Sequence, residues 1–180
     1  VSKILKKDNR VNGVETNQGQ IHSEWVILCG GMWARQLGMD IGVDIPLYPV
    51  EHHYVLSEPI EGISAKLPCT RDPNEMIYLR AEEDGRIRLG GFQKRSKPWT
   101  IDRIPNDFSF KLLEEDWDYF KQPLKAGKKR IPQLQKCKIP EFVNGPESFT
   151  PDNNFIMGVP PNTDGLFVLA GFNSVGIASA

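Results

Sequence analysis

Two short apolar segments that each run into glycine constrain the fold of this chain most strongly. The first is WVILC, residues 25–29, which leads into Gly30 and Gly31. The second is LFVLA, residues 166–170, which leads into Gly171. A short, continuously apolar segment is typical of a strand that is covered on both faces, as in a parallel sheet. We therefore expect two buried strands, each followed by a tight glycine turn.

A helix-forming segment follows each glycine turn. MWARQLG after the first turn predicts a helix that stops at Gly38, and SVGIASA after the second predicts a helix that begins near Ser174. This order brings backbone N–H groups close to a bound phosphate or ring. The phosphate-binding fingerprint G-x-G-x-x-G is absent from the chain. Each turn therefore suits a cofactor contact or the simple packing of a strand against a helix.

A sheet-rich insert of more than 100 residues lies between the two glycine turns. Strand-forming segments at residues 47–58, 75–82 and 86–93 are separated by turn residues, as in antiparallel hairpins. A small antiparallel meander is expected before residue 25, and a further strand within residues 138–152. The sequence therefore predicts a cofactor domain that is interrupted by a substrate domain.

Residues 106–124 predict an amphipathic helix that faces the core, with Asn106 or Asp107 as its N-cap. Its apolar residues recur at helical spacing: Phe108, Leu112, Leu113, Trp117 and Phe120. The basic run KAGKKR, residues 125–130, follows this predicted helix. Such a run suits a solvated face or a contact with an anion or a partner.

The composition is that of a globular protein and indicates neither a nucleic-acid nor a membrane partner. The chain is 39% hydrophobic and 25% charged, with a formal net charge of −1, so no global positive field attracts polyanions. No segment approaches the roughly 20 apolar residues that span a bilayer. Cys29, Cys69 and Cys137 lack the C-x-x-C spacing of a zinc or redox site, so no metal is expected. Cys29 is expected to be a small buried residue in a reducing compartment.

His52 and His53 stand side by side in the predicted strand PVEHHYVLSEP. Consecutive strand side chains leave by opposite faces, so at most one of these two rings points into a given cavity. If His52 faces a ligand, Tyr54 does too, whereas His53 and Val55 face away.

Seven collinear segments, spread over essentially the whole chain, carry a family resemblance. They are CGGMWARQLG, PLYPVEHHYVLSEPI, RDPNEMIYLR, GGF, KPW, NGPESFTPDNNFIMG and GLFVLAGFNSVGIASA. Together they resemble the FAD-dependent N-methylglycine oxidoreductases, which include the dimethylglycine and sarcosine dehydrogenases and dimethylglycine oxidase, within the wider D-amino-acid-oxidase-like group. The resemblance is to a family and does not select one substrate.

The resemblance implies an α+β fold. A large, mostly antiparallel substrate-domain sheet with helices is flanked by the later part of an α/β FAD-binding domain. Residues 1–45 are then a partial FAD-binding domain, residues 46–150 the substrate domain, and residues 151–180 the return to the FAD-binding domain. Val1 begins within a predicted strand without an initiating Met, so we expect a fragment of a longer protein. This fragment alone is expected to hold FAD weakly and to be inactive.

The implied reaction is the oxidative demethylation of an N-methyl amino acid of the dimethylglycine or sarcosine class. Hydride leaves the substrate for FAD, and water releases formaldehyde from the resulting iminium. The amine must be neutral, and a histidine can take its proton. The family's catalytic histidine and tyrosine map onto His52 and Tyr78. Strand alternation places Tyr54 beside His52 and Arg80 beside Tyr78, where Arg80 could pair with the substrate carboxylate.

Ordinary structural roles stay open for these residues. Without the resemblance, His52 reads as a hydrogen-bonded strand residue and Tyr78 as a core tyrosine. Arg71 and Lys94 rival Arg80 as the substrate cation, because an exposed arginine on a strand is common.

The family pattern also implies a set of residues around FAD. Val1 is expected by the adenine, and the flavin is expected to be met by Gly30, Gly31, Trp33, Gly171, Asn173, Ser174, Val175 and Gly176. A helix that begins near Ser174 would direct its N-terminal dipole at the flavin edge where negative charge develops on reduction.

The resemblance leaves several partners and locations open. Oxygen or an electron-transfer flavoprotein is the expected oxidant, and tetrahydrofolate is a further cofactor of related enzymes through a region that this chain does not contain. The expected location is the bacterial cytoplasm or the mitochondrial matrix. A catalytically silent relative, similar to the regulatory subunit of pyruvate dehydrogenase phosphatase, is the alternative to an enzyme.

Overall fold

A computed structural model describes residues 1–179 as two compact units. The first unit comprises residues 1–50, residues 98–108 and the chain from Glu147 onward, and the second comprises residues 51–97 and 109–146. Strands, mostly antiparallel, predominate over helices in the described chain, so the predicted α+β class is confirmed. The assignment of a cofactor domain and a substrate domain stays a prediction, because the units are defined by packing alone.

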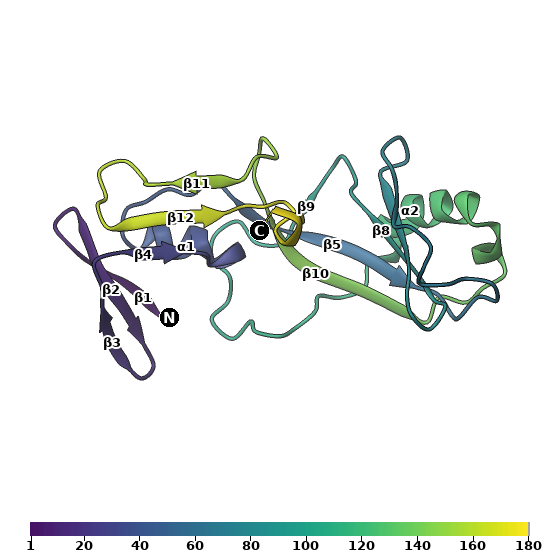
Figure 1. Cartoon of the computed structure of the whole chain (residues 1–180), viewed down its shortest axis with the longest axis horizontal. Helices are drawn as coiled ribbons and strands as arrows, with labels where there is room; N and C mark the ends of the chain where they lie inside the picture. The colour runs from purple at the N-terminus through teal and green to yellow at the C-terminus, as the bar shows by residue number, and fades with distance from the viewer. Residues whose placement is uncertain (180) are drawn as a thin grey trace. The chain divides into compact units, whose positions relative to one another are not determined.

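The first unit begins with the predicted meander (Figure 1). Strands β1 (Lys3–Lys7), β2 (Arg10–Thr16) and β3 (Gly19–His22) form a three-stranded antiparallel sheet in that order. Ile4 on β1 and Val11 on β2 are buried and join the core of this unit.

A second small sheet in the first unit has the order β11-β12-β4 (Figure 1). Its strands are β4 (Val26–Leu28), β11 (Ile156–Gly158) and β12 (Leu166–Ala170). β12 pairs with β4 in parallel, so the two apolar segments form neighbouring strands of one sheet.

The prediction that the segment at residues 25–29 is covered on both faces is wrong. Leu28 is 5% exposed and packs in the core cluster, whereas Ile27 is 64% exposed. Cys29, expected to be buried, is exposed as well. The physical reason is that β4 is an edge strand of its sheet, and in the described chain the core cluster covers only the face that carries Leu28.

The helix after the first glycine turn continues beyond its predicted stop. A 3₁₀ turn at Gly31–Trp33 leads into α1 (Ala34–Met39), so Gly38 lies inside the helix. Gly38 is buried, and a Cβ there would lie 2.7 Å from the carbonyl oxygen of Val43, so glycine is required for close packing. The chain reverses instead at Gly42, which has a φ of +77°.

Most residues of a six-stranded sheet lie in the second unit; the strand order is β10-β5-β8-β7-β6, and β9 pairs with β5. Its strands are β5 (Tyr48–Leu56), β6 (Thr70–Asp72), β7 (Ile77–Ala81), β8 (Ile87–Gly91), β9 (Lys97–Pro98) and β10 (Glu141–Phe149). The strands predicted from segments 47–58, 75–82, 86–93 and 138–152 are therefore confirmed. Alternate residues of β7 and β8 are buried and pack with residues of α2 (Trp117–Arg130) and the 3₁₀ turn Pro132–Gln135.

The helix predicted for residues 106–124 is wrong in its bounds. α2 begins at Trp117, where Asp116 caps it by accepting a hydrogen bond from the backbone N–H of Tyr119. The backbone N–H of Leu113 donates instead to the carbonyl oxygen of Asn144 on β10, at 2.8 Å. That contact holds the segment before α2 in a non-helical path. The basic run, expected after the helix, lies within its last turns, and Phe120 is fully buried as predicted.

Candidate active site

The two adjacent histidines of β5 point to opposite faces of the sheet, as the strand alternation predicts. His53 is 0% exposed, and so is Val55, whereas His52 and Tyr54 are half-buried. The His53 ring lies among aromatic rings of the core, with centroid distances of 5.0 Å to Tyr119 and 5.8 Å to Phe142. His53 is therefore a core residue.

His52 lies in a group of three rings on the other face. The ring planes of His52 and Tyr78 are 3° from parallel with centroids 6.2 Å apart, so the rings are offset. Phe92 lies 4.8 Å from the His52 ring and 5.6 Å from the Tyr78 ring. The structure thus brings together His52 and Tyr78, the two residues predicted to be catalytic, and adds Phe92, which the sequence did not single out. We call these three residues the aromatic trio.

Gly90 on β8 explains how Tyr78 reaches His52. β8 lies between β5 and β7, and Gly90 is paired with both Tyr54 and Tyr78 across the sheet. A Cβ at Gly90 would lie 2.0 Å from Cζ of Tyr78. The Tyr78 ring therefore lies directly over the backbone of β8, and only glycine permits this close approach.

The cations near the trio differ in their contacts. The guanidinium of Arg71 lies 5.0 Å from the centroid of the Phe92 ring, and Arg71 is paired with Tyr78 across β6 and β7. Arg80 shares the face of Tyr78, is exposed, and is paired with Arg88 across the sheet. The guanidinium of Arg88 lies 4.7 Å from the Tyr54 ring. Arg71, which sequence reasoning kept as a rival, therefore has the more direct contact with the trio.

A charged network lies on the core face of β5, beside His53. The Glu51 carboxylate accepts hydrogen bonds from Nδ2 of Asn144 at 2.7 Å and from Nζ of Lys97 at 3.1 Å, and lies 3.3 Å from Nε2 of His53. Lys97 also donates to the carboxylate of Asp116 at 2.7 Å. We call these five residues the Glu51 network. It ties β5, β9, β10 and the N-cap of α2 together.

The network shifts the pKa values of its members. Burial lowers the pKa of His53 below 6.5, although the Glu51 and Asp116 carboxylates oppose that shift. Hydrogen bonds to Asp116 and Glu51 raise the pKa of Lys97, and the hydrogen bond from Lys97 lowers the pKa of Asp116. Burial raises the pKa of the Tyr119 hydroxyl. His53 is therefore neutral at pH 7, while Lys97 and Asp116 are charged.

The two glycine turns of the first unit follow neighbouring strands. β4 and β12 are parallel and in register, with Leu28 opposite Val168, so their carboxyl ends lie at the same edge of the sheet (Figure 1). Gly31 after β4 has a φ of +53°, and Gly171 after β12 has a φ of +68°. A Cβ at Gly171 would also lie 2.5 Å from Cγ2 of Thr150. In open α/β sheets, ligands bind beyond the carboxyl ends of the strands.

The turn after β12 is held by its own side chains. Nδ2 of Asn173 donates to the carbonyl oxygen of Gly171 at 2.7 Å, and the backbone N–H of Thr150 donates to Oδ1 of Asn173 at 2.8 Å. The hydroxyl of Ser174 donates to the Glu147 carboxylate at 2.5 Å. Asn173 therefore shapes the turn with its polar atoms.

The prediction of a helix that begins near Ser174 is wrong for the described residues. Ser174 has a φ of +69°, and the only helical turn that follows is the 3₁₀ turn Ile177–Ser179. The rest of that prediction, at Ala180, lies outside the described residues. No N-terminal helix dipole at Ser174 supports the expected contact with a flavin.

The other residues predicted around FAD differ in exposure. Trp33 is 36% exposed and Val175 47%, and both follow a glycine of their turn closely. Gly30 directly precedes the 3₁₀ turn, and Gly176 follows Val175. Val1 is 71% exposed and precedes β1 in the other sheet of this unit.

Residues 1–179 contain neither a candidate metal-binding cluster nor a candidate membrane-spanning helix. No group of three or more His, Cys, Asp or Glu residues could hold a metal ion there. None of the helices described in that range has the length and apolar character needed to cross a membrane.

A model of one protein family, described as FAD dependent oxidoreductase (DAO), matches residues 1–180. The chain belongs to this family. It therefore carries the fold of FAD-dependent oxidoreductases, as the sequence resemblance implied.

Named relatives and solved structures agree with this family. The chain is 40% identical to 4-methylaminobutanoate oxidase (formaldehyde-forming) of Paenarthrobacter nicotinovorans, over 100% of this chain and 22% of that protein. It is 40% identical to human mitochondrial sarcosine dehydrogenase, over 93% of this chain and 18% of that protein. It is 39% identical to the mitochondrial pyruvate dehydrogenase phosphatase regulatory subunit of Mus musculus, over 97% of this chain and 20% of that protein. The chain thus spans about a fifth of these relatives.

The fold also matches that of a solved structure. The crystal structure of L-proline dehydrogenase from P. horikoshii superposes with a TM-score of 0.77 at 23% identity, and covers 98% of this chain and 44% of that one. At this identity the match concerns the fold.

The backbone at Gly31 leaves room for FAD beside the glycine turns that follow β4 and β12. Apart from Gly31 itself and its two chain neighbours, no heavy atom lies within 4 Å of the position that a Cβ of Gly31 would take, so the space beside this turn is open. Gly31 would therefore allow a planar ring to approach the backbone.

Sequence reasoning missed the Glu51 network and Phe92. Lys97 lies in the segment KPW and Phe92 in GGF. Both segments contributed to the resemblance, but no function was predicted for either residue. The members of the network are far apart in the sequence, and only strand pairing and the N-cap of α2 bring them together.

Proposed function

We propose that this chain is part of a flavin-dependent oxidoreductase that oxidatively demethylates an N-methyl amino acid of the dimethylglycine or sarcosine class. The names of two relatives support this proposal, since one is a formaldehyde-forming 4-methylaminobutanoate oxidase and the other is a sarcosine dehydrogenase. The observation that carries it is the aromatic trio, in which the His52 and Tyr78 rings lie 6.2 Å apart on one sheet face.

In this proposal His52 and Tyr78 are the catalytic residues. His52 takes the proton of the substrate ammonium at a ring nitrogen, which leaves the amine lone pair free. The Tyr78 hydroxyl orients the amine, and the Phe92 ring excludes water from that side. FAD, when bound, supplies the hydride acceptor.

The substrate carboxylate needs a cation, and the proposal assigns it to the face that carries the trio. Arg80 and Tyr54 are the substrate-binding residues that strand alternation predicts beside Tyr78 and His52. Arg71 competes with Arg80 for the carboxylate, because its guanidinium already lies against Phe92 at 5.0 Å. A guanidinium can bind a carboxylate with two parallel hydrogen bonds.

On the cofactor side, the proposal assigns the flavin to the edge formed by the two glycine turns. The contact residues are Gly30, Gly31, Trp33, Gly171, Asn173, Ser174, Val175 and Gly176, with Val1 near the adenine. The in-register parallel pairing of β4 and β12 supports this assignment, since it brings both turns to one edge.

The same proposal extends to partners of the whole protein. The flavin is reoxidised by oxygen or by an electron-transfer flavoprotein, and tetrahydrofolate takes the one-carbon unit where a folate region is present. The location is the bacterial cytoplasm or the mitochondrial matrix, since relatives occur in a bacterium and in mitochondria.

The test is amine oxidation by the full-length protein with dimethylglycine, sarcosine, proline and glycine betaine. We expect flavin reduction and formaldehyde with the first two only. Proline oxidation without formaldehyde, or reduction by none of the four, would contradict the proposed substrate class. Glycine betaine is the matched control, because its quaternary nitrogen has no lone pair.

A non-catalytic regulatory protein is the second candidate, because the regulatory subunit from Mus musculus is nearly as similar as the two enzymes. Both candidates predict the same fold. A full-length protein that shows the flavin absorbance band but is reduced by no N-methyl amine would favour the regulatory candidate.

A further inference from the structure

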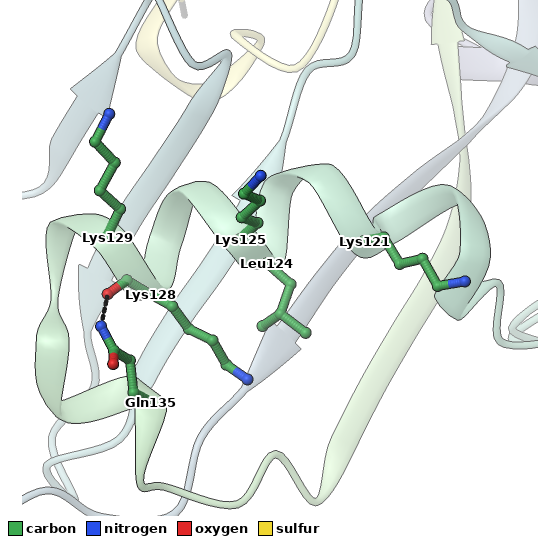
Figure 2. Close-up of a pocket in the computed structure, with 6 residues that line it drawn as sticks. All are labelled: Lys121, Leu124, Lys125, Lys128, Lys129 and Gln135. Carbon is green, nitrogen blue, oxygen red and sulfur yellow. Dashed lines mark hydrogen bonds between the residues drawn. The ribbon is translucent and has the colours of Figure 1, made fainter.

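One face of α2 concentrates positive charge in the second unit (Figure 2). A hollow of about 640 Å³ on this face is lined by Lys121, Leu124, Lys125, Lys128, Lys129 and Gln135. The Nε2 of Gln135 donates to the backbone carbonyl oxygen of Lys128 at 3.3 Å, which fixes the 3₁₀ turn beside the helix. We call this surface the lysine face. It stands out because the whole chain has a net charge of only −1.

Little of this charge is neutralised within the described chain. Lys121 pairs with Asp118 at 2.5 Å, and Lys129 lies 3.6 Å from the Glu75 carboxylate. These lysine side chains are 76% and 79% exposed, so water screens both pairs. No carboxylate of residues 1–179 forms an ion pair with Lys125 or Lys128.

Stability of the helix accounts for only part of the lysine face. Cations in the last turn of a helix interact favourably with its dipole, and this stabilises Lys128 and Lys129. Lys121 forms an i,i+3 pair with Asp118, whereas Lys125 lies outside the last turn and forms no ion pair within residues 1–179. Arg130, the third cation of the turn, instead pairs with Asp72 at 2.5 Å.

The arrangement of the lysines indicates what kind of ligand fits. Figure 2 shows the four side chains fanning out along the helix, with Leu124 between Lys121 and Lys128. Ammonium groups that diverge do not enclose a single small anion. A second copy of this chain does not fit either, since an isologous contact would bring one lysine face against another. An extended surface with several carboxylates fits both the charge and the partly apolar floor.

We propose that the lysine face docks an acidic segment of another protein. Lys121 to Lys129 span about 12 Å along the helix at 1.5 Å per residue, so the segment carries three or four carboxylates over that length. Lysine is a flexible point charge that gives fast, salt-dependent association with little geometric demand. The docking is therefore transient. It does not depend on the oxidoreductase activity proposed above.

The test measures binding of a fluorescein-labelled helical peptide with glutamate at every third or fourth position. Fluorescence anisotropy with the full-length protein at low salt is compared with the double variant Lys125→Glu and Lys128→Glu. The matched control is Lys66→Glu with Lys138→Glu, two exposed lysines of the same unit outside the hollow, which changes the net charge equally. We expect at least about a tenfold loss of affinity in the first variant and less than about twofold in the control.

Several results would overturn the proposal. Equal losses in the two double variants would show attraction by net charge alone, and no peptide binding at low salt would remove the docking surface. Displacement of the peptide by inorganic phosphate at equal concentration would indicate a single-anion site. Binding to phosphatidylserine vesicles that needs Lys125 and Lys128, without peptide binding, would indicate a membrane surface. Circular dichroism of both variants checks that α2 is intact.

Discussion

The two faces of β5 carry adjacent histidines with opposite surroundings. His53 is fully buried among Tyr119, Phe120 and Phe142, beside the Glu51 network. His52 is half-buried beside Tyr78 and Phe92. The comparison teaches that one residue step along a strand separates a fully buried position from a partly exposed one.

The largest expected effect is a loss of activity from a substitution on the face of β5 that carries His52. We expect His52→Ala to lower kcat/KM for the N-methyl substrate by about 10²- to 10⁴-fold, because it removes the proposed proton acceptor. The free energy of unfolding should change by less than about 1 kcal/mol, because His52 is not a core residue. His22→Ala, an exposed histidine on β3, is the control and should change neither quantity. A similar loss of activity in His53→Ala, measured on folded protein, would break the comparison.

The next largest effect is a loss of stability from a substitution on the face of β5 that carries His53. We expect His53→Ala to lower the free energy of unfolding by about 2–4 kcal/mol, because it leaves a cavity among three aromatic rings and removes a partner of Glu51. Urea unfolding followed by circular dichroism measures this loss. A stability equal to that of the unchanged protein would mean that His53 contributes no packing.

A matched pair of substitutions tests whether Arg71 or Arg80 binds the proposed substrate carboxylate. We expect Arg71→Met to raise KM for the N-methyl amino acid by at least about tenfold, and Arg80→Met by less than about threefold, because a lost charge-assisted hydrogen bond costs about 1.5–3 kcal/mol. Steady-state kinetics of both variants measure the difference. The opposite order would assign the carboxylate to Arg80, as strand alternation in the sequence predicted.

The smallest effect is the pH dependence of stability. The pKa of His53 is lowered below 6.5 by burial, so the unfolded chain binds a proton at this position at a higher pH than the folded chain does. Unfolding therefore becomes easier as the pH falls below about 6.5, and stability from this group is fully present above that value. We expect the fall between about pH 7 and pH 5 to be shallower in His53→Leu, measured by urea unfolding at each pH. Identical slopes would contradict the assigned shift.

Local patterns predicted most of the strands and the two glycine turns. Alternation along β5, β7 and β8 is enforced by a core on one side, so the faces of His52 and Tyr78 could be predicted from the sequence. The two short apolar segments predicted the strands β4 and β12 but not their pairing, and Ile27 and Cys29 are exposed because β4 is an edge strand.

The other predictions failed because contacts between residues far apart in the sequence determine the structure of those segments. Apolar spacing favoured a helix over residues 106–124, but Phe108 packs against Trp99 with centroids 4.3 Å apart, and Leu113 bonds to the backbone of β10. The Glu51 network could not be predicted, because no local pattern links residues 51, 97, 116 and 144. The helix expected at Ser174 fails because that residue adopts a left-handed conformation.

The Tyr78 ring lies over the main chain at Gly90, and this limits how this part of the molecule can change during evolution. A side chain that supports a ring can rotate or be exchanged for a shorter one, whereas a peptide plane in the middle of a sheet is held by hydrogen bonds on both edges. The height of the Tyr78 phenol above the sheet is therefore set by the main chain at Gly90. In the proposed site, adaptation to bulkier or slimmer substrates should proceed through Phe92, Arg71 and their neighbours, while positions 78 and 90 change together or stay as they are.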